Sequence, residues 1–193
     1  APGGTYIVPD EIFWVRWFRM LGENRETTII RLADSCDGYR NADRPKPVLR
    51  CRFLGNDCSP WDGAENSSFD NYIENLTVSV GRGNPGAIGI RYNSHNGGAL
   101  RDVTIRSEDG AGARGLDMTE TEFGPGLIRN VTIEGFDEGI VTVGSVSHAT
   151  FENIRLSNQG VVGLRNNMPV SIYGFSSTNT VPAIVNSESH MAH

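Results

Sequence analysis

The sequence lacks the features typical of nucleic-acid-binding and membrane-spanning proteins. Its 193 residues carry a formal net charge of −6 at pH 7, and Lys46 is the only lysine. Because phosphate backbones are bound by basic surfaces, we expect no nucleic-acid partner. No apolar run approaches the roughly 20 residues that a membrane helix needs, so we expect no membrane partner either.

Cysteine is also scarce. Cys36, Cys51 and Cys58 are an odd number of thiols, so they cannot all pair within the chain. They form no CxxC motif and no histidine cluster lies near them, which disfavours a zinc site. A Cys51–Cys58 disulfide and ordinary thiols both remain open. The sequence therefore predicts no zinc site, and we expect no cofactor, with calcium as the one ion left open.

What the sequence does have is a repeat, rich in turn-forming residues. Four segments share an Asn or Asp followed by alternating apolar residues, and these turn residues are Asn75, Asp102, Asn130 and Asn153. A second marker, a glycine before an apolar residue, follows each segment at Gly89, Gly115, Gly139 and Gly163. A weaker fifth copy covers residues 171–175 and 182–185.

Two markers that recur with one period predict a solenoid. Such a repeat is a unit that cannot bury its own apolar face and must stack on its neighbours. Apolar and polar residues alternate within each copy, which is the period of a β-strand, and no helical stripe separates the copies. A βαβ sheet would need helical crossovers. We therefore expect an all-β fold, a single-stranded right-handed parallel β-helix of about five to seven coils.

The same repeat predicts the domain organisation and the register. We expect one β-helix domain over residues 1–193, with a loop excursion at 35–70 that holds one strand, and regular coils over 71–190. The predicted inward columns are Leu76, Val103, Val131 and Ile154, and Val78, Ile105, Ile133 and Leu156. The predicted outward ladder is Thr77, Thr104 and Thr132. The Asn or Asp residues would form an Asx turn or an asparagine ladder, and the glycines would mark bends that need special backbone angles.

Three stretches carry a resemblance to a known superfamily: Pro2-Gly-Gly-Thr-Tyr-Ile-Val, Thr28-Ile-Ile-Arg-Leu and the repeated Asn-Val-Thr-Ile coils. With them the chain resembles, over almost its whole length, the pectate-lyase-like right-handed β-helices, especially proteins near the polygalacturonases. The resemblance implies this fold, a polysaccharide or oligosaccharide partner, and a secreted or periplasmic location. It specifies fold better than chemistry, because many activities share it.

The two ends depart from that family pattern. Members usually carry an aspartate-rich segment and an amphipathic helix that cap the first coil, whereas this sequence opens at Ala1-Pro-Gly-Gly-Thr. Open solenoid ends expose unpaired backbone and apolar surface. We therefore expect a segment of a longer protein, ends covered by another subunit, or self-association through the ends. Near the first end, Trp14 and Trp17 are candidates for stacking on sugar rings, with burial in the core as the alternative.

An acidic cluster supplies the candidate chemistry. On a β-helix, neighbouring outward side chains lie roughly 5–7 Å apart, and glycosidases need two carboxyl groups about 5–9.5 Å apart. The candidate catalytic residues are Asp117, Glu120, Glu122 and Asp137. The candidate substrate-binding residues are Arg91, His95, Glu138 and Arg165. The structural alternative is a cross-coil ion pair between Arg91 and Asp117, with Glu120 and Glu122 solvated in a loop.

The leading hypothesis is a glycoside hydrolase that cleaves polysaccharides with a carboxylate pair on the outer face. The adjacent aspartates and the glycine-histidine motif of polygalacturonases are absent, so no catalytic residue is transferred from the resemblance. Two alternatives stay open. One is a non-catalytic β-helix module for glycan binding or assembly, and the other is a calcium-dependent polysaccharide lyase, although no calcium ligand set with recognisable spacing is visible.

Overall fold

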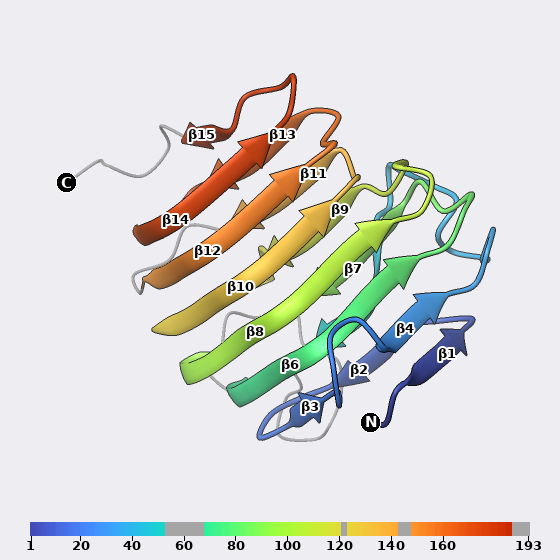
Figure 1. Ribbon diagram of the computed structural model, residues 1–193, viewed down its shortest axis with the longest axis horizontal. Coiled ribbons are helices and arrows are strands. Elements are labelled where there is room, and N and C mark those ends of the chain that lie inside the picture. The colour runs from blue at the N-terminus through green and yellow to red at the C-terminus, as the bar shows by residue number, and fades with distance from the viewer. Residues whose placement is uncertain (53–67, 121–122, 143–147, 187–193) are drawn as a thin grey trace.

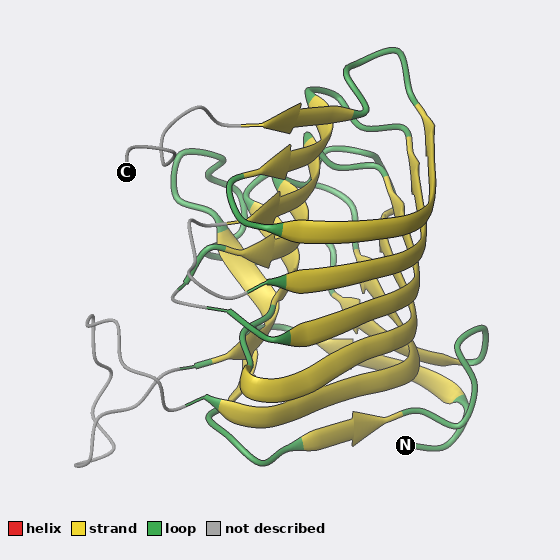
Figure 2. Ribbon diagram, turned by 90° about the vertical axis from the view of Figure 1, so that its left-hand side faces the viewer, coloured by secondary structure: helices red, strands yellow, loops and turns green. Residues whose placement is uncertain are grey.

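The described chain is built from parallel strands wound into a stack of coils (Figures 1 and 2). The computed structural model describes residues 1–52, 68–120, 123–142 and 148–186. These described residues contain no helix, and therefore no helix that could span a membrane. The strands are β1 (Gly4–Val8), β2 (Ile12–Trp14), β3 (Arg19–Leu21), β4 (Thr28–Leu32), β5 (Lys46–Cys51), β6 (Phe69–Val80), β7 (Ala87–Arg91), β8 (His95–Ser107), β9 (Arg114–Met118), β10 (Gly126–Glu134), β11 (Glu138–Thr142), β12 (Ala149–Ser157), β13 (Val162–Asn166), β14 (Val170–Thr178) and β15 (Ile184–Asn186).

The strands form two sheets. The first has the order β1-β4-β6-β8-β10-β12-β14, with β3 also paired to β6, and the second has the order β15-β13-β11-β9-β7-β5-β2. From β4 onward, successive strands alternate between the two sheets, and from β6 onward each long strand of the first sheet is followed by a short strand of the second (Figure 2). All pairings between these strands are parallel. The predicted parallel β-helix is confirmed.

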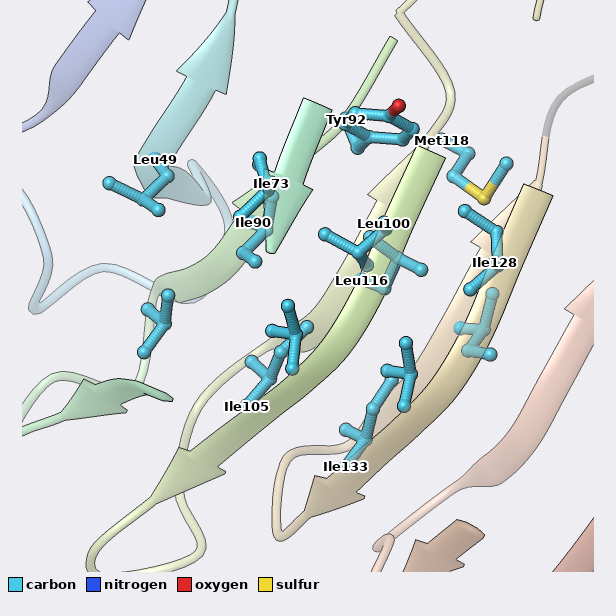
Figure 3. Close-up of a cluster of buried hydrophobic side chains, with 14 of the residues drawn as sticks. Leu49, Ile73, Ile90, Tyr92, Leu100, Ile105, Leu116, Met118, Ile128 and Ile133 are labelled. Carbon is cyan, nitrogen blue, oxygen red and sulfur yellow. The ribbon is translucent and has the colours of Figure 1, made fainter. Parts of the chain in front are cut away.

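The predicted register is also confirmed. Val103 pairs with both Leu76 and Val131, and Ile105 pairs with both Val78 and Ile133. All six side chains are almost completely buried. Their columns run through the interior between the two sheets, where Figure 3 shows Ile105 and Ile133 among the buried side chains. Each coil therefore buries its apolar residues against equivalent residues of the next coil, about 4.8 Å away.

The repeated Asn and Asp residues turn the chain inside the long strands. Asn75, Asp102, Asn130 and Asn153 all have φ between 53° and 57°, a left-handed conformation that Asn and Asp tolerate best after glycine. Their side chains form a ladder: the Asn130 amide donates to Asp102 at 2.9 Å, and the Asn153 amide donates to Asn130 at 3.1 Å. In the fifth copy Gly174 takes this position, with φ 69°. The asparagine ladder is confirmed.

The recurrent glycines have a different role from the predicted one. Gly89, Gly115, Gly139 and Gly163 lie inside β7, β9, β11 and β13, and none of the four has positive φ. A Cβ on Gly115 would lie 2.8 Å from the carbonyl oxygen of Gly139 and would also meet the Ile133 side chain. The prediction of bends with special backbone angles was wrong, because these glycines are needed for close packing between coils.

The excursion predicted for residues 35–70 is only partly described. Its expected strand is β5, which pairs with β2 and β7 and so belongs to the second sheet. Cys36 and Cys51 are buried free thiols, so the Cys51–Cys58 disulfide is not formed; Cys58 itself lies outside the described residues. Burial raises the pKa of the Cys51 thiol, which disfavours the reactive thiolate.

Both ends of the described coil stack expose large apolar side chains. At the first end these are Tyr6, Ile7, Phe13, Trp17, Phe18 and Leu21, and at the other end Val161, Ile172, Tyr173 and Ile184. The two tryptophans considered for sugar stacking differ in burial. Trp14 is buried and its indole N–H donates to Asn71 at 3.2 Å, whereas Trp17 is 65% exposed. Trp14 is therefore a core residue, and Trp17 is available at the surface.

Candidate functional site

A row of outward side chains crosses the second sheet from coil to coil. Strand pairing gives equivalent positions to Phe13, Arg50, Arg91, Asp117, Val141 and Arg165. They come from β2, β5, β7, β9, β11 and β13, whose backbones lie about 4.8 Å apart. We call the charged part of this surface, together with the acids and arginines that contact it, the arginine row. Its residues are Glu11, Arg50, Arg52, Arg91, Arg114, Asp117, Glu120, Glu138 and Arg165.

Asp117 lies at the centre of the row. Its Oδ2 accepts hydrogen bonds from Arg91 Nε at 3.2 Å, Arg91 Nη2 at 3.0 Å and Arg114 Nη1 at 3.1 Å. Its Oδ1 accepts from the Thr119 backbone N–H at 2.9 Å and the Thr119 hydroxyl at 2.6 Å. The cross-coil ion pair with Arg91, which the sequence offered as the structural alternative, is present.

The surroundings of Asp117 keep its carboxyl group ionised. Burial, which is complete for this side chain, would raise its pKa, but Arg91, the Thr119 hydroxyl and Arg114 lower it by more. The net result is a pKa below the usual value. Asp117 is thus suited to anchoring arginines, and it is poorly suited to donating a proton.

Glu138 extends the row by two more arginines. Its Oε2 accepts from Arg114 Nε at 3.1 Å, and its Oε1 accepts from Arg165 Nε at 2.7 Å. Arg114 therefore bridges the Asp117 and Glu138 carboxylates, which lie on consecutive coils. Arg114 and Asp117 are three residues apart, yet their contact places both on the outer face, because the two-residue alternation is interrupted at Gly115.

A second cluster of charges occupies the β2 and β5 end of the row. Arg50 donates from Nε to both Glu120 carboxylate oxygens, at 3.0 and 3.1 Å, and its Nη1 lies 3.8 Å from Glu11 Oε1. Burial would lower the pKa of Arg50, but Glu120 and Glu11 raise it above its usual value. Arg52 Nη2 donates to Glu11 Oε2 at 2.8 Å. The predicted residue Glu120 is thus brought to this end of the row, through Arg50.

Asp137 differs from the other acids. Asp137 immediately precedes Glu138 and is exposed, and no described side chain forms an ion pair with it. Burial of its carboxyl group and the neighbouring Glu138 charge both raise its pKa. An exposed carboxyl group with a raised pKa has the property that a general acid needs.

The remaining predicted residues are placed differently. His95 is only 2% exposed and lies inside the coil, where its Nδ1 accepts from the Ser68 backbone N–H at 3.1 Å. It does not join the outer face on which the sequence prediction placed it. Glu122 lies outside the described residues. Of the eight predicted site residues, the structure gathers Arg91, Asp117, Glu120, Glu138 and Arg165 into the arginine row.

Sequence reasoning missed four members of the row: Glu11, Arg50, Arg52 and Arg114. Arg114 could have been found, because it precedes the recurrent glycine as Glu138 does in the next coil. The other three follow no repeat marker, so only the fold brings them to this face. Within the described residues, no group of three or more His, Cys, Asp or Glu side chains is arranged to hold a metal ion.

Comparison with known proteins gives one informative match. The model of the family described as "Rhamnogalacturonase A/epimerase, pectate lyase-like" matches residues 1–181. The chain belongs to this family. No curated protein and no solved structure gives a significant match. Membership of this pectate-lyase-like family agrees with the parallel β-helix described above and places the chain among carbohydrate-active proteins.

Proposed function

We propose that this pectate-lyase-like chain binds an acidic polysaccharide along the arginine row. The observation that carries the proposal is a set of guanidinium groups held in place by carboxylates, with donors to spare. Arg91, Arg114 and Arg165 use Nε and at most one terminal nitrogen in hydrogen bonds to described residues. Because guanidinium has five N–H donors, several remain for carboxylate or sulfate groups of a glycan.

The repeat geometry suits a polymer. Equivalent side chains recur at the strand spacing of about 4.8 Å, so a linear ligand can make similar contacts on several coils. The donors are also fixed before binding, since Asp117 and Glu138 each hold two arginines. Fixed donors lose less conformational entropy when they bind a ligand.

Arg165 gives the sharpest test. It lies at one end of the row, its side chain is 42% exposed, and it contacts Glu138 only through Nε. We expect Arg165→Ala to weaken binding of uronate oligosaccharides by roughly tenfold, with neutral glucan oligosaccharides as the reference, in isothermal titration calorimetry. Raising the salt concentration should reduce the difference in affinity between the wild type and the Arg165→Ala variant, because salt screens the charges.

Arg129→Ala is the matched control. Arg129 is also 42% exposed and also contacts one glutamate, Glu152, but it lies on the first sheet. Its replacement should leave the affinity unchanged. Equal loss in both variants, or failure of every acidic oligosaccharide to bind, would refute binding along the arginine row.

A second candidate function is hydrolysis, favoured by the exposed Asp137 and its raised pKa. In this proposal Asp137 protonates the glycosidic oxygen as the bond to the anomeric carbon breaks, and water supplies the new oxygen. Release of reducing ends from acidic polysaccharides should then require Asp137, and Asp137→Asn should abolish it while Glu26→Gln, at an exposed loop acid, should not. Binding without reducing ends would exclude hydrolysis, and product absorbance at 235 nm would indicate a lyase instead.

A further inference from the structure

The β2 and β5 end of the arginine row has two buried polar atoms without hydrogen bonds. Glu11 Oε1 and Arg52 Nε are both shielded from solvent, and neither has a hydrogen-bond partner among the described residues. The Glu11 side chain is only 9% exposed. Buried polar groups in proteins are nearly always hydrogen-bonded, so two such atoms in one place need an explanation.

The two atoms are complementary and belong to one ion pair. Glu11 and Arg52 are joined by a single hydrogen bond, from Arg52 Nη2 to Glu11 Oε2 at 2.8 Å, which leaves Oε1 as an acceptor and Nε as a donor. Arg50 Nη1 is 3.8 Å from the same Oε1, too far for a hydrogen bond. A hydroxyl group can donate one hydrogen bond and accept others, so sugar hydroxyls match both atoms.

An exposed aromatic ring lies beside this ion pair. Phe13 is 50% exposed, and the Arg52 guanidinium carbon lies 4.0 Å from its ring centroid. Phe13 also pairs in register with Arg50, which puts it on the same outward row as Arg91 and Asp117. The flat apolar face of a sugar ring packs well against an aromatic ring, whose hydrophobic surface is otherwise costly to expose to water.

We propose that Glu11, Phe13 and Arg52 form a sugar-binding subsite at the β2 and β5 end of the arginine row. One sugar ring stacks on the exposed part of the Phe13 ring. The Arg52 side chain moves aside to open the two shielded atoms, and the sugar hydroxyl groups then donate to Glu11 Oε1 and accept from Arg52 Nε. This inference rests on the proposed polysaccharide binding, and it places one sugar unit of the bound chain at a defined end of the arginine row. It assigns the subsite to hydroxyl groups and an apolar ring face, whereas Arg91, Arg114 and Arg165 face the acidic groups.

The test uses variants that distinguish stacking of a sugar on a flat ring from contact with apolar surface in general. Phe13→Leu keeps an apolar side chain but removes the flat ring, and we expect it to weaken binding of a uronate oligosaccharide roughly tenfold in calorimetric titration. Phe13→Trp keeps a flat ring and should retain the affinity. Glu11→Gln keeps the shape but removes the carboxylate, and it should weaken binding at least fivefold.

Tyr173→Leu is the matched control, because Tyr173 is also an exposed aromatic residue but lies on β14 of the first sheet. It should leave the affinity unchanged. If Arg165→Ala weakens binding while Phe13→Leu and Glu11→Gln do not, the subsite is refuted and the arginine row stands. If the wild type binds none of the oligosaccharides, both proposals are refuted. Far-UV circular dichroism of each variant verifies that the coil stack has folded.

Discussion

Replacing Asp117 by asparagine perturbs the arginine row with almost no change in shape. The asparagine carbonyl can take the place of Oδ1 and keep both hydrogen bonds from Thr119. The amide nitrogen then replaces Oδ2, which accepts three hydrogen bonds from Arg91 and Arg114. Donors would face donors, and two arginines would lose their shared counter-charge.

The expected loss of stability follows from burial. Removing one partner of a buried ion pair destabilises a protein by about 3–5 kcal/mol. The Asp117 side chain is fully buried, but the side chains of Arg91 and Arg114 are 19% and 30% exposed and keep some hydration. We therefore expect the lower end of that range, about 3 kcal/mol. With a urea slope of about 2–3 kcal/mol per M, the unfolding midpoint would fall by about 1–1.5 M.

Urea unfolding followed by far-UV circular dichroism measures this shift, with Glu152→Gln as the control. Glu152 also binds an arginine across coils, but neither side chain of this pair is buried, so its loss should destabilise the protein by less than about 1 kcal/mol. Equal midpoints for the two variants would refute the buried network. The pKa of Asp117 is lowered by folding, so its contribution is present above the unfolded-state value of about 3.9 and is lost as pH falls through the folded-state value. The difference between wild type and Asp117→Asn should therefore shrink below about pH 4.

Three further predictions concern the coil stack. Ile105→Asp would bury a charge between Val78 and Ile133 and should abolish folding, seen as loss of soluble yield and of β-sheet circular dichroism; a folded variant would contradict the register. Gly115→Ala should lower stability by about 1–3 kcal/mol in urea unfolding, because its methyl group would approach the Gly139 carbonyl, and an unchanged midpoint would show that the coils can separate there. Asn130→Ala should lower the free energy of unfolding by about 1–3 kcal/mol, because it removes the ladder hydrogen bonds and puts alanine at a positive φ. Asn130→Gly should lower it by less, because glycine adopts positive φ freely, and equal losses would rule out backbone strain as a contributor.

The fold was predictable from the sequence because its physical cause is itself repeated. Val103 and Ile105 face the interior for the same reason as their equivalents one coil away, so aligned copies give both the strand register and the buried columns. The role of Gly115 was not predictable in this way. A repeated glycine is compatible with positive φ or with close packing, and only the neighbouring Gly139 carbonyl decides between them.

The candidate site was predictable only where it follows the repeat. Arg91, Asp117 and Arg165 occupy one repeat position, and the structure places them in one row. Glu11 immediately precedes β2 and Arg52 immediately follows β5, and neither strand carries a repeat marker. The contact between these two residues depends on the pairing of β2 with β5. His95 shows the converse error, since nothing in a single sequence distinguishes a buried histidine from an exposed one.

Stability alone does not account for the arginine row. Replacing buried ion pairs by well-packed apolar residues is often neutral or stabilising, so an outer face can be built without them. The first sheet shows a simpler solution in Thr77, Thr104 and Thr132, whose β-branched side chains pair directly across coils. The second sheet instead places Arg50 beside Arg91, and so requires a carboxylate for each. Ligand binding explains this arrangement, because the carboxylates hold the arginine donors in the positions in which a polyanionic chain would bind them.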